Sequence, residues 1–193
     1  MNAILPAMHK RCPWIHSDEK SCNESLDLLS HSGGAMAEAI TLESGDKSPL
    51  FDAPDSKGEH HNLTELISAG NKVILYFYPR DSTPGCTVQA CDFRDDMARL
   101  SSHGYKVFGV SKDSLKSHES FKDKFKFPFE LISDPDEKVC RIFDVIKEKS
   151  MYGKKYMGIE RSTFLIDSNG KLIEEWRKVK VKGHVEEVLS ALD

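Results

Sequence analysis

The side chains best suited to chemistry lie in one run of fourteen residues, from Tyr78 to Cys91. The run reads Tyr-Pro-Arg-Asp-Ser-Thr-Pro-Gly-Cys-Thr-Val-Gln-Ala-Cys and follows an apolar, strand-like segment. Thr83 is a favourable helix N-cap, and Pro84 suits the first helical position. The run therefore predicts a helix that begins at Pro84 and places Cys86 third in its first turn.

A cysteine at that place is suited to redox chemistry as its thiolate. Unpaired backbone N–H groups and the positive end of the helix dipole stabilise negative charge in a first turn. The pKa of a cysteine falls at such sites from a free value of roughly 8.5, and only the thiolate attacks. The position of Cys86 therefore predicts a reactive nucleophile.

The same cysteine also fits an apolar core. One helical stripe, with alternating steps of four and three residues, contains Cys86, Ala90, Phe93, Met97 and Leu100. Free cysteine is a common core residue, so a lone cysteine on such a stripe is more often structural than catalytic. The position of Cys86 beside the cap, after a lead-in rich in proline and glycine, favours the redox interpretation.

Cys91 restricts the chemistry further. Five residues along a helix separate two α-carbons by roughly 9 Å, whereas a disulfide requires roughly 7 Å or less. A bond between Cys86 and Cys91 would thus require part of the helix to unwind. The spacing differs from that of CxxC dithiols, and no third and fourth ligand completes a zinc or iron–sulfur site.

The run from Pro79 to Cys86 resembles the Pro-x-x-x-Thr-x-x-Cys signature of peroxiredoxins. Its continuation to Cys91 resembles the PrxQ subfamily, also called bacterioferritin comigratory protein. Residues 158–167, Gly-Ile-Glu-Arg-Ser-Thr-Phe-Leu-Ile-Asp, resemble the later family strand whose arginine contacts the active-site sulfur. The resemblance covers roughly residues 44–193.

The resemblance implies a role for each matching residue. Cys86 would attack a peroxide oxygen and become a sulfenic acid, and Cys91 would resolve it as a disulfide. Thr83 would hydrogen-bond the sulfur or the peroxide, Arg161 would hold the thiolate and polarise the O–O bond, and Pro79 would shield the pocket from water. The implied activity is reduction of hydrogen peroxide and organic hydroperoxides, with thioredoxin as reductant.

Other interpretations of these residues stay open on sequence grounds. Thr83 could be an N-cap alone, and an arginine at the start of a strand, such as Arg161, is usually solvated or paired at the surface. Cys140 could compete as a resolving partner. The same cysteine chemistry would also serve a peroxide-sensing switch that signals by binding a partner, and a non-catalytic thioredoxin-fold module is a third alternative.

The remaining pattern predicts an α/β scaffold. Apolar runs predict strands at 73–78, 106–111, 129–132, 161–166 and 171–176, and amphipathic runs predict helices at 114–124, 137–143 and 184–192. The Asn169-Gly170 pair predicts a hairpin between the last two strands. This order, with the resemblance, implies a thioredoxin-like fold in which helices flank a central mixed β-sheet, with an N-terminal β-hairpin. The alternation at 176–182 further suggests a strand with exposed lysines at a sheet edge.

The chain divides into a domain and an extension. Residues 44–193 form the predicted peroxiredoxin domain, whereas residues 1–40 are polar and predicted to be flexible. Met36 is an alternative start, and Cys12 and Cys22 would give the extension a regulatory or partner-binding role if it is authentic.

Composition excludes some classes of binding partner and indicates a cellular compartment. The net charge of −4 argues against a general role in nucleic-acid binding, and no segment is apolar enough to span a membrane. Five cysteines without a disulfide-framework spacing indicate a reducing, cytoplasmic setting. No metal or other cofactor is implied, and the resemblance favours a monomer.

Overall fold

The computed structural model describes residues 42–151 and 153–192. A central five-stranded sheet has the order β5-β4-β3-β8-β9. The strands of this sheet are β3 (Lys72–Phe77), β4 (Tyr105–Ser111), β5 (Glu130–Ser133), β8 (Ser162–Ile166) and β9 (Leu172–Trp176). The β3–β4 and β4–β5 pairs are parallel and the β3–β8 and β8–β9 pairs are antiparallel, so the sheet is mixed, as predicted.

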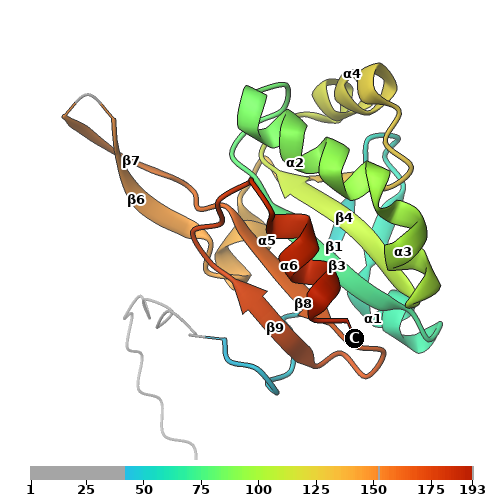
Figure 1. The fold of residues 1–193 in the computed structure, drawn as a ribbon. Coiled ribbons are helices and arrows are strands. Elements are labelled where there is room, and N and C mark those ends of the chain that lie inside the picture. Colours follow the sequence, from blue (N-terminus) through green and yellow to red (C-terminus); the bar gives the residue numbers. More distant parts are fainter. Residues whose placement is uncertain (1–41, 152, 193) are drawn as a thin grey trace, which may run out of the picture. The chain divides into compact units, whose positions relative to one another are not determined.

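Two hairpins lie outside this sheet. The N-terminal hairpin pairs β1 (Asp52–Pro54) with β2 (His60–Asn62), which agrees with the fold expectation. The second pairs β6 (Ile146–Met151) with β7 (Lys154–Ile159) and was not predicted. Figure 1 shows β6 and β7 extending away from the sheet. Their sequence is rich in lysine and lacks the apolar alternation of a half-buried strand, which explains the omission.

Helices cover both faces of the sheet (Figure 1). They are α1 (Leu63–Ser68), α2 (Pro84–Asp95), α3 (Met97–Ser102), α4 (Leu115–Phe125), α5 (Lys138–Ile142) and α6 (His184–Ser190). The predicted helices therefore exist, with ends that differ by one or two residues. The stripe from Cys86 to Leu100 runs over two helices rather than one, because α2 ends at Asp95 and α3 begins at Met97.

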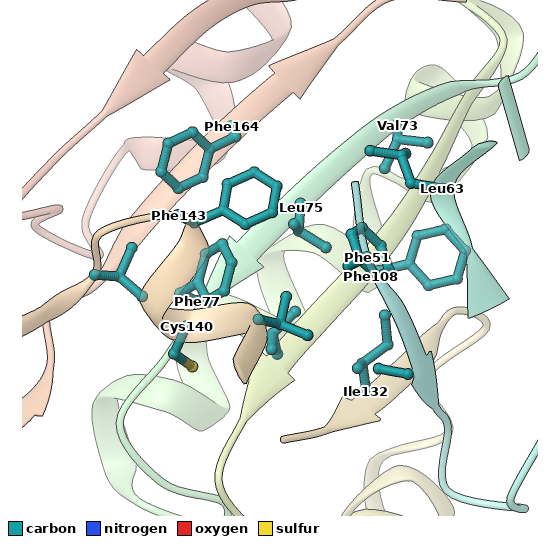
Figure 2. Close-up of a cluster of buried hydrophobic side chains, with 14 of the residues drawn as sticks. Phe51, Leu63, Val73, Leu75, Phe77, Phe108, Ile132, Cys140, Phe143 and Phe164 are labelled. Atoms are coloured by element: carbon teal, nitrogen blue, oxygen red, sulfur yellow. The ribbon is translucent and has the colours of Figure 1, made fainter. Parts of the chain in front are cut away.

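Alternation along β3 divides the core into two layers. Val73, Leu75 and Phe77 point into one cluster, which Figure 2 shows together with Phe143 and Cys140. Ile74 and Tyr76 belong to the opposite cluster. Every residue of β3 from Val73 onward is buried, as expected for a strand covered on both faces. The two sides of the sheet thus provide two separate apolar environments.

One sequence expectation about the sheet edge is wrong. The strand predicted over 176–182 does not form. β9 ends at Trp176, and the residues that follow it form a loop. Lys178 in this loop has φ = 50°, which is incompatible with a continued strand. The loop instead returns to the region of α2, where the Val181 side chain approaches the Gly85 backbone.

Candidate active site

Cys86 lies where the sequence predicted it, third in α2 and just beyond the carboxyl end of β3. Thr83 occupies the N-cap position with extended backbone, and Pro84 is the first helical residue. The Cys86 side chain is buried, with 2% exposure, and belongs to the core layer that contains Tyr76 and Phe93. Both descriptions drawn from sequence therefore hold, since Cys86 is a first-turn residue and also part of the apolar stripe.

Arg161 contacts this sulfur although it lies 75 residues further along the chain. It immediately precedes β8, which is paired with β3, so its side chain reaches the end of β3 where α2 begins. The Arg161 Nη2 atom donates to Cys86 Sγ at 3.2 Å. A guanidinium keeps its charge at any physiological pH. The arrangement therefore places a permanent cation against a buried sulfur.

Gln89 completes the contacts of Arg161 and was missed by the sequence argument. The Gln89 Oε1 atom accepts a hydrogen bond of 2.5 Å from Arg161 Nη1. Gln89 is fully buried and lies one helical turn after Cys86. The signal was present in the sequence, because a polar residue stands beside Cys86, Ala90 and Phe93 on the buried side of one helix.

Thr83 and Pro79 are near the site, in the loop before α2. The Thr83 hydroxyl donates to the Arg80 carbonyl at 3.0 Å, and its side chain makes no capping hydrogen bond. Thr83 is thus an N-cap by position only, and its oxygen lone pairs stay available as acceptors. Pro79 is exposed at the start of the same loop.

A buried polar cluster holds this loop, and it too was missed. Asp81 Oδ2 lies 2.8 Å from His118 Nδ1 and accepts a hydrogen bond from Ser117 Oγ at 2.7 Å. Ser117 and His118 both belong to α4. Tyr78 donates to Asp81 Oδ1 at 2.8 Å. The His118 side chain is fully buried, on the same face of α4 as Phe121. Its place in that apolar stripe was the available sequence signal.

Two further ionisable groups surround Arg161. Burial lowers the pKa of Lys149 on β6, and the charge of Arg161 adds to this, whereas Glu160 and Cys86 oppose it. Burial likewise lowers the pKa of His184, and Arg161 adds to the shift despite the opposing effect of Glu187. His184 Nε2 lies 2.8 Å from Thr163 Oγ1. The neutral form of His184 is therefore favoured near the cationic site.

The described cysteines, Cys86, Cys91 and Cys140, are all free thiols. Cys91 is half-buried on α2, which is intact around it, so the helix separates the two sulfurs as the spacing predicted. Cys140 lies in the core layer on the other side of the sheet (Figure 2). This placement removes Cys140 as a direct competitor of Cys91 in the folded state. Cys12 and Cys22 lie outside the described residues, as does Met36.

Within residues 42–151 and 153–192, no group of three or more histidine, cysteine, aspartate or glutamate side chains could hold a metal ion. Over the same ranges, no helix is long and apolar enough to cross a membrane.

Comparison with known proteins identifies the family. Residues 44–175 match the profile of the AhpC/TSA family. The chain belongs to this family. A putative peroxiredoxin Bcp of Coxiella burnetii is 52% identical over 153 residues, covering 79% of this chain and all of that relative. Peroxiredoxin Bcp of Bacillus subtilis is 49% identical over 153 residues, which is 79% of this chain and 96% of the relative.

Solved structures agree with the family assignment. Peroxiredoxin Q of Xanthomonas campestris superposes with a TM-score of 0.69 at 50% identity, covering 74% of this chain and 89% of that one. A cysteine-to-serine variant of PrxQ from Xylella fastidiosa gives a TM-score of 0.74 at 41% identity, covering 79% and 96%. The thioredoxin-like fold expected from the sequence is confirmed, and this AhpC/TSA protein is a peroxiredoxin, a thiol-dependent peroxidase of the Bcp/PrxQ type.

Proposed function

We propose that Cys86 is the peroxidatic cysteine and that Arg161 stabilises both its thiolate and the charge that develops on the departing oxygen. The contact of 3.2 Å from Arg161 Nη2 to Cys86 Sγ is the observation that carries this assignment. A fixed cation at the sulfur acts in a water-poor site, where it is most effective. Thr83 accepts a hydrogen bond from the peroxide, and Pro79 limits the access of water.

The oxidation step forms one bond and breaks one bond. The Cys86 thiolate attacks the terminal oxygen of a hydroperoxide, an S–O bond forms and the O–O bond breaks. The sulfur is oxidised to a sulfenic acid, and the leaving oxygen departs as an alkoxide or hydroxide that takes a proton from solvent. The products are an alcohol, or water when the substrate is hydrogen peroxide.

Cys91 resolves the sulfenic acid. Its thiol displaces the sulfenic oxygen as water and forms a Cys86–Cys91 disulfide, for which part of α2 must unwind because the intact helix holds the α-carbons roughly 9 Å apart. The half-buried position of Cys91 supports this role, since limited unwinding suffices to free it. Cys140, on the opposite side of the sheet, is unsuited to it.

The reductant and the substrate range follow from the family chemistry. A dithiol protein, which we propose to be thioredoxin, reduces the disulfide through a mixed disulfide and becomes oxidised itself. The peroxidase acts as a monomer in a reducing compartment, the cytoplasm, and residues 44–193 form the catalytic domain.

The X. campestris bacterioferritin comigratory protein is described through its alkyl peroxide reduction activity, at 47% identity to this chain and a TM-score of 0.70, which supports organic hydroperoxides as substrates alongside hydrogen peroxide.

Mass spectrometry of the peroxide-treated protein tests the division of labour. We expect a Cys86–Cys91 bond in the parent, and sulfenic or sulfinic acid on Cys86 in a Cys91→Ser variant. A bridge from Cys86 to another cysteine in the parent would overturn the role of Cys91.

Turnover separates the peroxidase from the sensing alternative. With thioredoxin, thioredoxin reductase and NADPH present, an enzyme consumes many equivalents of peroxide, whereas a switch stops after one. Consumption of NADPH in proportion to added peroxide is the expected result.

A further inference from the structure

The lysines of the loop after β9 are not explained by the fold. Lys178, Lys180 and Lys182 are exposed, and their alternation predicted a protected sheet edge. β9 ends at Trp176, so the three lysines protect no strand. In the part of the chain that the structure describes, none of them forms an ion pair, in contrast to Lys155 on the β6–β7 hairpin. Three unpaired charges on one loop therefore require another explanation.

The sheet register brings this loop to the edge where Cys86 lies. Phe77, the last residue of β3, pairs with Ser162, the first residue of β8. The next residue of β8, Thr163, pairs with Trp176, the last residue of β9. The carboxyl ends of β3 and β9 therefore lie at the same edge of the sheet. Figure 1 shows the loop between β9 and α6 running toward the start of α2.

Two contacts hold this loop beside the site. The Val179 backbone N–H donates to the Arg161 carbonyl at 2.9 Å. The Val181 side chain lies beside Gly85, the residue before Cys86. The lysines on either side of this valine are exposed. The loop therefore places two exposed cations beside the first turn of α2.

Other exposed residues extend this surface. Arg80, in the loop before α2, is exposed and forms no ion pair with another described residue. Val88 on α2 is 51% exposed and supplies apolar surface next to these charges. We call the four exposed cations the cationic rim, which consists of Arg80, Lys178, Lys180 and Lys182. Because the formal net charge of the chain is −4, the rim is a local concentration of positive charge.

We propose that the cationic rim is the docking surface for the protein that reduces the disulfide, and that this reductant carries acidic residues around its reactive dithiol. The inference rests on the proposed function, since it requires the disulfide between Cys86 and Cys91. Opposite charges on facing surfaces steer two proteins into contact and raise their rate of association. An exposed apolar residue beside a polar rim, such as Val88, is the usual anatomy of a protein interface.

The rim stays in place when the disulfide forms. The unwinding that joins Cys86 to Cys91 occurs within α2, whereas all four rim residues lie outside this helix. A thiolate of the reductant attacks one sulfur of the bridge, a mixed disulfide forms, and the other sulfur leaves as a thiolate that takes up a proton. The second thiolate of the reductant then displaces the remaining sulfur. Two electrons thus pass to the cysteine pair, and the reductant becomes a disulfide.

Salt dependence tests the rim in the unaltered protein. The full chain with the Cys86–Cys91 disulfide is mixed in a stopped-flow instrument with either a reduced, acidic thioredoxin or dithiothreitol, a small dithiol without a protein surface. We expect the rate constant with thioredoxin to fall at least about tenfold between about 0.01 M and about 1 M salt, because the screening length falls from about 30 Å to about 3 Å. The rate constant with dithiothreitol should change by less than about twofold.

A pair of charge reversals locates the effect on the rim. For Lys180→Glu/Lys182→Glu, we expect the ratio of the thioredoxin rate constant to the dithiothreitol rate constant to fall about tenfold at low salt. The matched control is Lys47→Glu/Lys171→Glu, which changes the net charge equally at the opposite end of β9, where these two exposed lysines form a β-bridge. Its ratio should stay within about twofold of that of the parent. Division by the dithiothreitol rate removes any effect of the substitutions on the disulfide itself.

The outcomes are distinct from those for the main proposal. A thioredoxin rate constant that does not depend on salt, or that rises with salt, would overturn the rim as a docking surface for an acidic reductant. An equal loss in the two double variants would do the same. A parent protein that forms no Cys86–Cys91 disulfide, or whose disulfide thioredoxin does not reduce at any salt concentration, would instead contradict the proposed function itself.

Discussion

Cys86 and Cys140 occupy the same position in two helices yet have opposite surroundings. Each is the third residue of its helix, α2 for Cys86 and α5 for Cys140, and each is buried, with 2% and 0% exposure. Cys86 receives a hydrogen bond from Arg161. Cys140 lies in the other core layer, and its backbone N–H donates to Asp134 Oδ2 at 2.8 Å.

The charged groups nearest to the two thiols differ in sign. Burial raises the pKa of Cys140 far above its ordinary value, and the negative charges of Asp134 and Glu137 raise it further against the weaker opposing effect of Lys112. At Cys86 the nearest charged partner is instead the guanidinium of Arg161. Two cysteines in the first turns of their helices therefore meet tertiary partners of opposite charge.

The largest expected difference is in the alkylation of the native protein. Because each unit of pKa is a tenfold change in thiolate fraction, we expect iodoacetamide to modify Cys86 at least about 1,000-fold faster than Cys140 at neutral pH. Peptide mapping by mass spectrometry over time measures both rates in one sample, and unfolding in denaturant should make the rates similar. Comparable alkylation rates of Cys86 and Cys140 in the folded protein would contradict the proposed difference between the two sites.

Removing the cation at Cys86 should make its environment more like that of Cys140. We expect Arg161→Met to lower the rate of peroxide reduction by about 10²- to 10³-fold, the usual effect of removing one donor from a site of developing charge. Stopped-flow oxidation kinetics would measure it, with Arg99→Met as a surface control. A rate near that of the parent would show that the helix N-terminus is sufficient, contrary to the comparison.

The loop before α2 is fixed by the buried pair between Asp81 and His118, and loss of one partner of such a pair is strongly destabilising. We expect His118→Ala to lower the free energy of unfolding by about 3 kcal/mol, measured by urea denaturation. His103→Ala, at an exposed position, should change it by less than about 0.5 kcal/mol.

The smallest effect concerns the protonated thiol of Cys140. Its pKa is higher in the folded than in the unfolded protein, so its stabilising contribution is complete below the unfolded pKa and declines as the pH rises above it. From about pH 8 to about pH 9.5, the parent should lose about 1 kcal/mol more unfolding free energy than Cys140→Ala. Because both proteins share all other titrating groups, parallel stability curves would argue against a raised pKa at Cys140.

Local sequence signals predicted the helix that carries Cys86 and the strand before it. Thr83 and Pro84 mark the start of α2 through backbone preferences that need no distant partner. Asn169 and Gly170 mark the β8–β9 turn for the same reason, with Gly170 at φ = 75°. The β6–β7 hairpin was not predicted because its strands carry little apolar pattern.

The candidate site was predicted less completely than the fold. Cys86, Cys91 and Arg161 were found through spacing and family resemblance, and their catalytic roles stay predictions. Gln89 and His118 were missed because each lies on an apolar helix face, and their polar partners come from segments far away in the sequence. Backbone periodicity records which face is buried, but it carries no information on which distant side chain meets it.

The sequence by itself determined that a cysteine lies in the first turn of a helix that follows a buried strand, because cap and strand preferences act over a few neighbouring residues. Only the tertiary structure decided which of two similarly placed cysteines faces a cation and which faces carboxylates. Pairing of β3 with β8 brings Arg161 to Cys86 across 75 residues of chain, whereas the fold places Asp134 beside Cys140. Electrostatic interaction depends on distance in space, and that distance is set by the packing of the whole domain.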